Sequence, residues 1–273
     1  MRRALLLCLF LMPVIAICAL LAAGPVSAQS AEDNEALAKQ SQNPIANMIS
    51  LPLQNNTFFG VGPGDAVTND FNIQPVYPLG IGGVNVINRF ILPVKYQGEV
   101  VAGIGDQWGL GDLSYSAFLS PANAGSVTWG IGPSFLFPTA TDDRLGTGKW
   151  SAGIAAVILT MPGKWVIGAL AQNVWSFAGD DERSDVNFFF SQYFINYNIK
   201  NGWYLSTAPI ITANWEAESG DQWTVPVGGG AGKLFRLGKT PVDAQVQAFY
   251  NVEKPEGGAD WSLRLQFKLL FPK

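Results

Sequence analysis

The sequence contains no histidine, and its two cysteines, Cys8 and Cys18, both lie within the first 28 residues. Beyond residue 28, Ser-His and Cys-His nucleophile pairs and metal sites made of histidine or cysteine are therefore excluded. Disulfide bonds are excluded there as well, so hydrogen bonds and buried surface must stabilise the fold. These absences predict a protein that is not an enzyme and that has no cofactor, no catalytic residue and no metal site.

Long hydrophobic runs are also scarce, although 48% of the residues are hydrophobic and only 14% are charged. The one long run extends from Ala4 to Gly24, after a basic start and before the small residues Ser27 and Ala28. This pattern predicts a cleaved secretory signal peptide over residues 1–28. No later run reaches the roughly 20 apolar residues of a membrane-spanning helix.

A polar segment, residues 29–43, follows the predicted cleavage site. Ser30, with Asp33 three residues later, resembles a helix cap, and Pro44 would end a short helix. The alternative is a disordered segment, which is common near a chain terminus. We expect a periplasmic N-terminal leader, a short helix or disordered, and we favour a loosely ordered leader over a plug.

The remaining apolar residues are spread over twelve short stretches. Each is rich in β-branched and aromatic residues and is bounded by clusters of Gly, Pro, Asn and Asp, as the strands of a meander are. The stretches are 49–59, 70–78, 84–92, 109–119, 126–137, 150–160, 165–176, 187–198, 203–214, 223–234, 241–251 and 261–271. They predict that residues 44–273 form one all-β domain, a transmembrane up-and-down antiparallel β-barrel of about 12 strands.

The connectors between these stretches fall into two alternating classes. Every second connector is short, and its only charges are the basic ones of Lys164, Lys200, Arg236 and Lys239. The others tend to be longer and acidic, such as 180–186. Bacterial outer-membrane barrels have short periplasmic turns and longer outer loops. The asymmetry therefore predicts a bacterial outer-membrane protein with both termini in the periplasm.

The last stretch, "WSLRLQFKLLF", alternates between apolar and polar residues. Because successive side chains of a strand point to opposite faces, one set must face lipid and the other the lumen. The lipid set is Leu263, Leu265, Phe267 and Leu269, and the lumen set is Arg264, Gln266 and Lys268. A charge on the lipid face would cost about 2–4 kcal/mol at mid-membrane, which fixes this orientation. Stretch 187–198 carries aromatic residues on both faces, so its orientation stays open.

Polar residues on the inward faces of the strands are the candidates for a functional site. The predicted lumen-lining residues are Arg89, Lys95, Asp112, Asp243, Gln245, Gln247, Arg264, Gln266 and Lys268. Because the first and last strands must pair to close a barrel, Arg264 and Lys268 are expected near Gln54 and Asn56. Twelve strands enclose an interior between the filled eight-stranded barrels and the porins. The lumen is then either a selective constriction or a closed, cross-linked interior.

Tryptophan residues recur at the ends of the predicted strands. Six are expected at the ends next to the acidic loops and two at the ends next to the short turns, as two aromatic girdles. They are Trp108, Trp150, Trp175, Trp215, Trp223 and Trp261, and then Trp165 and Trp203.

An ordered series of motifs resembles a bacterial outer-membrane transporter family labelled MetA-pathway of phenol degradation. The motifs include "NPIANMISLPLQNN", "GLGDLSYSAFLSP", "GIGPSFLFPTATDDRLGTGKW", "WTVPVGGGAGKLFRLGKTPV" and the final "LLFPK". The resemblance covers about residues 43 to 273. It implies an outer-membrane barrel of a Gram-negative bacterium that takes up aromatic or other small hydrophobic compounds.

Two functions are compatible with these patterns. The first is a channel for passive uptake of small solutes, with aromatic or hydrophobic compounds among them. The alternative is a closed structural or surface-interaction barrel without transport. The expected partners are outer-membrane lipid, lipopolysaccharide, a small-molecule solute and, during biogenesis, periplasmic chaperones and the barrel-assembly machinery. Without Arg2 and Arg3 the 17 basic residues fall to 15, against 21 acidic residues, and this net charge of −6 argues against nucleic acid.

Overall fold

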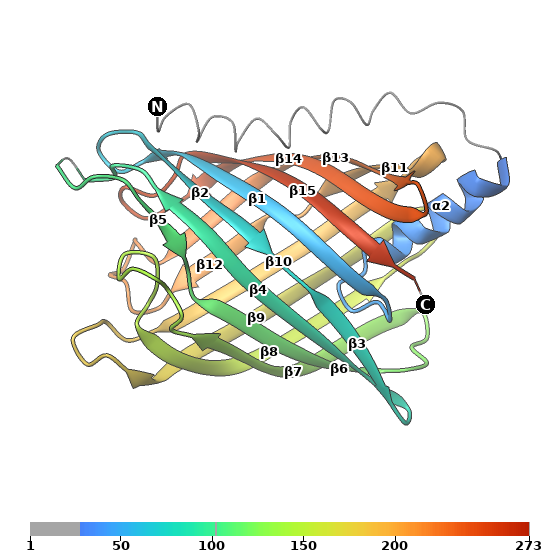
Figure 1. Cartoon of the computed structure of the whole chain (residues 1–273), viewed down its shortest axis with the longest axis horizontal. Coiled ribbons are helices and arrows are strands. Elements are labelled where there is room, and N and C mark those ends of the chain that lie inside the picture. Colours follow the sequence, from blue (N-terminus) through green and yellow to red (C-terminus); the bar gives the residue numbers. More distant parts are fainter. Residues whose placement is uncertain (1–27, 102, 273) are drawn as a thin grey trace.

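The β-branched and aromatic stretches form one closed antiparallel sheet. The computed structural model describes residues 28–101 and 103–272, and within them fifteen strands fill twelve positions around a barrel. The strands of each position pair with those of the next position along the chain, β9 pairs with β10, and β15 pairs with β1, so the wall has no open edge (Figure 1). The predicted 12-strand transmembrane barrel is confirmed.

The strands match the twelve predicted stretches closely. They are β1 Ile49–Val61, β2 Ala66–Ile73, β3 Val76–Ile81, β4 Val84–Gln97, β5 Gln107–Leu110, β6 Leu113–Pro121, β7 Val127–Phe137, β8 Lys149–Thr160, β9 Trp165–Gly179, β10 Asn187–Asn198, β11 Trp203–Thr207, β12 Ile210–Asn214, β13 Trp223–Leu237, β14 Thr240–Glu253 and β15 Trp261–Phe271. A short 3₁₀ helix, η1 Lys200–Gly202, connects β10 to β11. The second and third positions extend beyond the predicted stretches, to residues 66 and 97 respectively.

Three of the twelve positions contain a break. Two breaks contain a proline, Pro75 between β2 and β3 and Pro209 between β11 and β12, and proline cannot donate a hydrogen bond to a neighbouring strand. The third lies between β5 and β6. A break leaves backbone groups free for other partners: the carbonyl oxygen of Ala208 accepts hydrogen bonds from Arg264 (2.8 Å) and Gln192 (3.0 Å).

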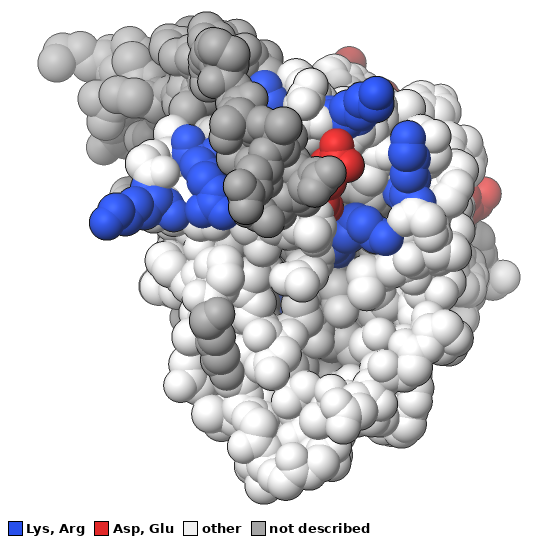
Figure 2. Space-filling view, turned by 90° about the vertical axis from the view of Figure 1, so that its right-hand side faces the viewer, with Lys and Arg blue, Asp and Glu red and all other residues white. Residues whose placement is uncertain are grey.

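The two ends of the barrel differ. The long connectors gather at one end, and the short turns lie at the other end together with helix α2 and the C-terminus (Figure 1). Figure 2 views the short-turn end, where Lys and Arg side chains gather in the upper part of the view and acidic side chains are fewer. The charge asymmetry of the sequence is thus an asymmetry between the two ends of the molecule.

Side chains alternate between the inside and the outside of the wall. On β15, Arg264 is buried in the interior while Trp261 is exposed outside, as the sequence predicted. On β7, Val127, Trp129 and Ile131 are exposed outside. The strand without an assigned orientation, β10, turns Phe194, Asn196 and Asn198 inward.

The first and last strands form the closing pair of the barrel. Asn56 lies opposite Arg264, Gln54 opposite Gln266, and Pro52 opposite Lys268. The Nε atom of Arg264 donates a hydrogen bond of 2.9 Å to the side-chain oxygen of Asn56. The expectation that Arg264 and Lys268 lie near Gln54 and Asn56 is therefore confirmed.

Helix α2 Ala28–Ser41 precedes the barrel and takes up most of the predicted leader, which was expected to be a short helix or disordered. The helix lies across the short-turn end (Figure 1), with Leu37 and Ala38 buried. Ser30 falls inside the helix rather than at its cap. Almost all of the predicted signal peptide, residues 1–27, lies outside the described residues. Within the described part of the chain, no helix is both long and apolar enough to cross a membrane.

Candidate functional site

The lumen of the barrel has two chemically different sides. One side, which we call the apolar wall, is a packed cluster of buried residues mainly on β4, β6, β8, β9 and β10. Its members are Ile45, Val76, Ile87, Phe118, Ala155, Val157, Leu159, Val166, Leu170 and Phe194. The opposite side, the polar wall, is formed by amide, hydroxyl and charged side chains of β1, β4, β11, β14 and β15 with Gln74. They are Gln54, Asn56, Gln74, Arg89, Tyr204, Ser206, Asp243, Gln245, Gln247, Arg264, Gln266 and Lys268.

Only the polar wall was predictable from alternation. On β8 the inward residues Ala155, Val157 and Leu159 are as apolar as the outward residues Ile154 and Ile158. A strand that is apolar on both faces gives no alternating signal, so the sequence could not show that half of the lumen is apolar.

A chain of side-chain hydrogen bonds links two arginines along the polar wall. Arg89 donates to the Gln74 side-chain oxygen (3.0 Å), and Gln74 donates to Gln54 (2.8 Å). Gln54 in turn donates to the Asn56 oxygen (3.1 Å), which also accepts from Arg264. Because amides both donate and accept, this chain holds the two guanidinium groups in place without a carboxylate.

Arg264 is fixed by four contacts and is only 6% exposed. Besides Asn56, it donates to the Ala208 carbonyl (2.8 Å) and to the Gln247 side-chain oxygen (3.4 Å). Its guanidinium carbon lies 4.9 Å from the ring centroid of Phe249, a cation–π distance. All four partners are electrically neutral, so the positive charge of Arg264 persists in the lumen.

Asp243 is held by hydroxyl groups. Its two carboxylate oxygens accept hydrogen bonds from Tyr204 (2.5 Å) and from Ser41 (2.7 Å). The Tyr204 ring lies over Gly232 on β13, where a Cβ atom would overlap the ring. Glycine at this position therefore makes the room that lets Tyr204 reach Asp243.

The N-terminal residues 35–48, which we call the docked segment, close the short-turn end of the lumen. Leu37, Ala38 and Met48 pack against Leu234 and Leu270 of the barrel. The contact buries apolar surface on both partners, and a buried leucine contributes about 1.5–3 kcal/mol.

Polar contacts add to this docking. Gln42 and Asn198 exchange two hydrogen bonds (2.9 and 3.1 Å). Lys268 donates to the Ser41 carbonyl oxygen (2.6 Å), next to the bond between Ser41 and Asp243. Two charged residues of the lumen therefore bind the segment that closes it.

A cavity of about 130 Å³ lies between the docked segment and the two walls. Arg89, Asp243, Arg264 and Lys268 are the charged residues that line it. Apolar atoms of Met48, Val76, Leu170, Phe194 and Ala208 line it as well. For comparison, a protein cavity of roughly 150 Å³ accepts a benzene molecule. The cavity is slightly smaller than this and is thus of the size of a single small ring or several waters, with cationic groups on one side.

The charge of this cavity is not balanced. Among residues 28–101 and 103–272, no carboxylate lies within 4.0 Å of Arg89, Arg264 or Lys268. Lys268 is within electrostatic range of both Asp243 and Arg89. Asp243 therefore offsets one of the three positive charges, and the cavity keeps an excess of positive charge.

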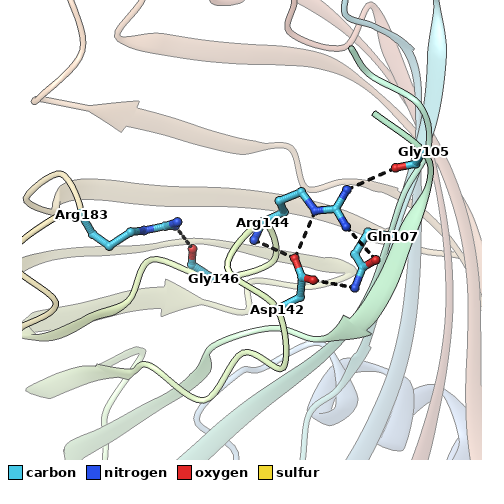
Figure 3. Close-up of polar contacts among 6 residues, drawn as sticks. All are labelled: Gly105, Gln107, Asp142, Arg144, Gly146 and Arg183. Carbon is cyan, nitrogen blue, oxygen red and sulfur yellow. Dashed lines mark hydrogen bonds and ion pairs between the residues drawn. The ribbon is translucent and has the colours of Figure 1, made fainter. Parts of the chain in front are cut away.

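At the opposite end, connector 138–148 folds against the inner side of β5. Trp108 points outward with 74% exposure, so Gly109 faces inward, where Thr141 and Leu145 pack against it. Arg144 fixes this connector by donating to the carbonyl oxygen of Gly105 in the neighbouring connector (3.2 Å) and to the side-chain oxygen of Gln107 at the start of β5 (2.8 Å) (Figure 3). The long connectors therefore form a linked layer at the mouth.

Asp142 and Arg183 complete this layer (Figure 3). Asp142 accepts a hydrogen bond from Gln107 (2.8 Å), and Arg183 donates to the Gly146 carbonyl (2.6 Å). Hydrogen bonds from the backbone and side chain of Arg144 hold the pKa of Asp142 below its usual range. The Asp142 carboxylate is therefore ionised at neutral pH, and its contribution to the layer is lost only in acid, as the pH falls through that lowered pKa.

Seven of the nine predicted lumen residues line the cavity, and two do not. Asp112 instead binds connector 138–148, accepting from the backbone N–H groups of Ala140 (3.1 Å) and Thr147 (2.6 Å). Lys95 lies nearer the mouth, opposite Asp70, whose charge acts on it. The position of Asp112 in the break between β5 and β6 puts its carboxylate beside the backbone of this connector, away from the cavity.

Several residues of the site were missed. Tyr204 and Gln74 both face inward. Tyr204 has an apolar ring and a polar hydroxyl, so alternation did not mark it as polar, and Gln74 lies between β2 and β3, before a proline, where the alternation is interrupted. Ser41 and Gln42 belong to the predicted leader, and only the docking of α2 brings them to the lumen. No signal in the sequence predicts that contact.

The eight predicted girdle tryptophans are all exposed on the outer surface, with values between 36% and 74%. Six lie where strands meet the long connectors, and Trp165 and Trp203 begin strands at the short-turn end. Several form aromatic contacts, such as Trp215 with Trp223 at 5.2 Å and Phe59 with Trp261 at 4.0 Å between ring centroids. Their assignment to lipid interfaces stays a prediction.

Comparison with known proteins gives similarity in fold. No family model matches the chain, and no curated protein matches it. The chain is similar in structure to the COG4313 outer membrane channel from Pseudomonas putida F1, with 17% identity over 82% of this chain and 95% of that one and a TM-score of 0.63. The chain is less similar in structure to outer membrane phospholipase A from Escherichia coli, with 13% identity over 88% of this chain and 98% of that one and a TM-score of 0.45. Similarity to the CymD monoaromatic hydrocarbon channel has 10% identity over 92% of this chain and 94% of that one, with a TM-score of 0.46.

The closed barrel and its similarity in fold to the COG4313 channel confirm a barrel of the outer-membrane type and support the predicted outer-membrane location. The more specific family label stays a prediction. The prediction that the chain is not an enzyme is withdrawn, because a barrel fold does not decide whether a protein is an enzyme. The lack of histidine and cysteine beyond residue 28 excludes only the sites that need those residues.

Proposed function

We propose that the barrel is an outer-membrane channel for the passive uptake of small solutes, including aromatic or hydrophobic compounds. The observation that carries this proposal is the cavity between the two walls, which offers apolar surface on one side and hydrogen-bonding groups on the other. Sites for small organic molecules have this composition, with apolar lining and a few placed polar groups. The structure similar in fold at a TM-score of 0.63 is also named as a channel.

Uptake requires a path past both closed ends. At the short-turn end the obstacle is the docked segment, which packs on the barrel through Leu37 and Met48 and through hydrogen bonds of Glu35, Lys39, Ser41 and Gln42. At the mouth it is connector 138–148. We propose that movement of these two segments opens the lumen, since neither is a strand of the wall.

The proposal includes an orientation and partners. The short-turn end with α2 faces the periplasm, the long connectors face outward toward lipopolysaccharide, and the exposed tryptophans contact lipid at the two interfaces. Periplasmic chaperones and the barrel-assembly machinery then act on the chain during biogenesis.

A closed structural barrel is the second candidate, because the polar wall is cross-linked by hydrogen bonds from Arg89 to Gln247. Planar-bilayer recording on the refolded protein separates the two. Discrete conductance steps, reduced by added benzoate or phenol, are expected of the channel. Liposomes with verified folded barrel that stay impermeable to small solutes of every charge would favour the closed barrel.

A further inference from the structure

The cationic groups of the cavity have donors that no protein acceptor uses. A guanidinium carries five N–H donors. Arg89 makes one side-chain hydrogen bond, to Gln74, and Arg264 makes three, to Asn56, Ala208 and Gln247. Within residues 28–101 and 103–272 the remaining N–H groups of both side chains have no protein partner. Both residues line the cavity, so these groups are available to whatever enters it.

Their acceptors are neutral amides and carbonyls, although carboxylates are the usual partners of buried arginines. An uncompensated buried charge destabilises a protein. Proteins usually reduce this desolvation cost by pairing the charge with a group of opposite charge. The single carboxylate that lines the cavity, Asp243, is already bound by two hydroxyl groups and lies by Lys268. The cavity is therefore complementary to an added negative charge.

The opposite side of the cavity has a different preference. Leu170 and Phe194 of the apolar wall line it together with Met48 of the docked segment. These side chains offer no hydrogen bonds, so an inorganic anion would keep one side of its hydration shell facing apolar atoms. A molecule with a charged group and an apolar body satisfies both sides.

We propose that this cavity binds a small organic anion, a carboxylate that carries one ring or a short alkyl body. The carboxylate accepts hydrogen bonds from Arg89 and Arg264, and the apolar body packs against Leu170 and Phe194. Arginine suits this role because its planar donors match the two oxygens of a carboxylate. This inference rests on the proposed channel function, because it places the site on the path of the solute. It adds the chemical class of that solute.

Titration calorimetry on the full-length folded protein in detergent micelles tests the site. Benzoate is the probe, and benzyl alcohol is the neutral comparison of similar size. We expect benzoate to bind at least tenfold more tightly than benzyl alcohol. Arg89→Gln and Arg264→Gln should each weaken benzoate binding roughly ten- to a hundredfold, the loss expected when a hydrogen bond to a charged group is removed. Neither substitution should change the binding of benzyl alcohol by more than about twofold.

Arg236→Gln is the matched control. Arg236 is exposed near the short-turn end of β13, outside the cavity, so this substitution removes the same charge and should leave benzoate binding unchanged. The proposal would be overturned if benzoate and benzyl alcohol bound with equal affinity, or if Arg236→Gln weakened benzoate binding as much as Arg89→Gln does. Because Arg264 supports the closing pair, Arg89→Gln is the decisive variant if Arg264→Gln fails to fold.

A bilayer measurement distinguishes this proposal from the channel itself. Conductance without benzoate binding would leave the channel standing and refute the anion site. Benzoate binding to a barrel that conducts nothing would support the site and refute the passage of solutes. If both the channel and the anion site are correct, the reversal potential across a salt gradient should show a preference for anions. Arg89→Gln should abolish this preference.

Discussion

At the scale of single residues, Gly232 controls the position of Tyr204. Substitution Gly232→Ala would place a methyl group inside the Tyr204 ring, which must move and lose its bond to Asp243. Overpacking of this kind costs about 1–3 kcal/mol. We expect a loss of that size in the free energy of unfolding, measured by urea titration of tryptophan fluorescence in lipid vesicles.

Gly83 is the control for this experiment. It lies in the turn between β3 and β4, where an added Cβ atom would meet nothing within 4 Å and the backbone is not left-handed. Gly83→Ala should change the free energy of unfolding by less than about 0.5 kcal/mol. A Gly232→Ala protein that is as stable as Gly83→Ala would show that Tyr204 has room to move.

Prediction from sequence was strongest for residues whose neighbours follow from strand pairing. Arg264 and Asn56 could be placed together because both sides of the closing pair alternate and closure forces them to meet. Asp112 could not be placed, since its partners lie on a connector with no periodicity. Tyr204 depends on the glycine opposite it, a relation between two strands that one strand does not reveal.

At the scale of elements, the docking of α2 depends on its apolar face. Leu37 is buried against the barrel, while the adjacent Ala36 is exposed. Substitution Leu37→Asp should release the docked segment, because it removes about 1.5–3 kcal/mol of apolar burial and puts a charge there. We expect faster backbone hydrogen exchange over residues 41–48 and more open time in planar bilayers.

Ala36→Asp adds the same charge to the same helix at an exposed position. It should leave both hydrogen exchange and open time as in the wild type. If Leu37→Asp raises hydrogen exchange and leaves conductance unchanged, the docked segment does not gate the lumen. If neither quantity changes, the apolar contact with Leu234 and Leu270 does not hold the segment.

Elements also differ in how well the sequence predicted them. The twelve strand positions were clear because turn residues bound every one, whereas the breaks inside three of them were not, although proline marks two. Alternation assigned the faces of β15, and it failed on β8, where both faces are apolar. The packing of α2 on the barrel depends on the complementary shapes of the two surfaces, which composition alone does not reveal.

At the scale of the whole molecule, the outer surface of the barrel is matched to lipid. Leu265 lies near the middle of β15 on the outer face, and its neighbour Gln266 faces the cavity. Leu265→Arg should lower the free energy of unfolding in vesicles by about 2–4 kcal/mol. Gln266→Arg, one position along the same strand, should cost less than half as much, as measured by the same urea titration. Equal costs would mean that the outer face is not in lipid.

The closing pair also determines when folding can finish. The hydrogen bond between Asn56 and Arg264 joins residues 208 positions apart, so a very long loop must be closed before it forms. Contacts of this kind slow folding, and until β15 arrives, β1 and β14 are exposed sheet edges. The step that seals the wall also carries Arg264 into the lumen. The time that the last strand takes to arrive therefore sets how long the unfinished sheet is open to aggregation with other copies.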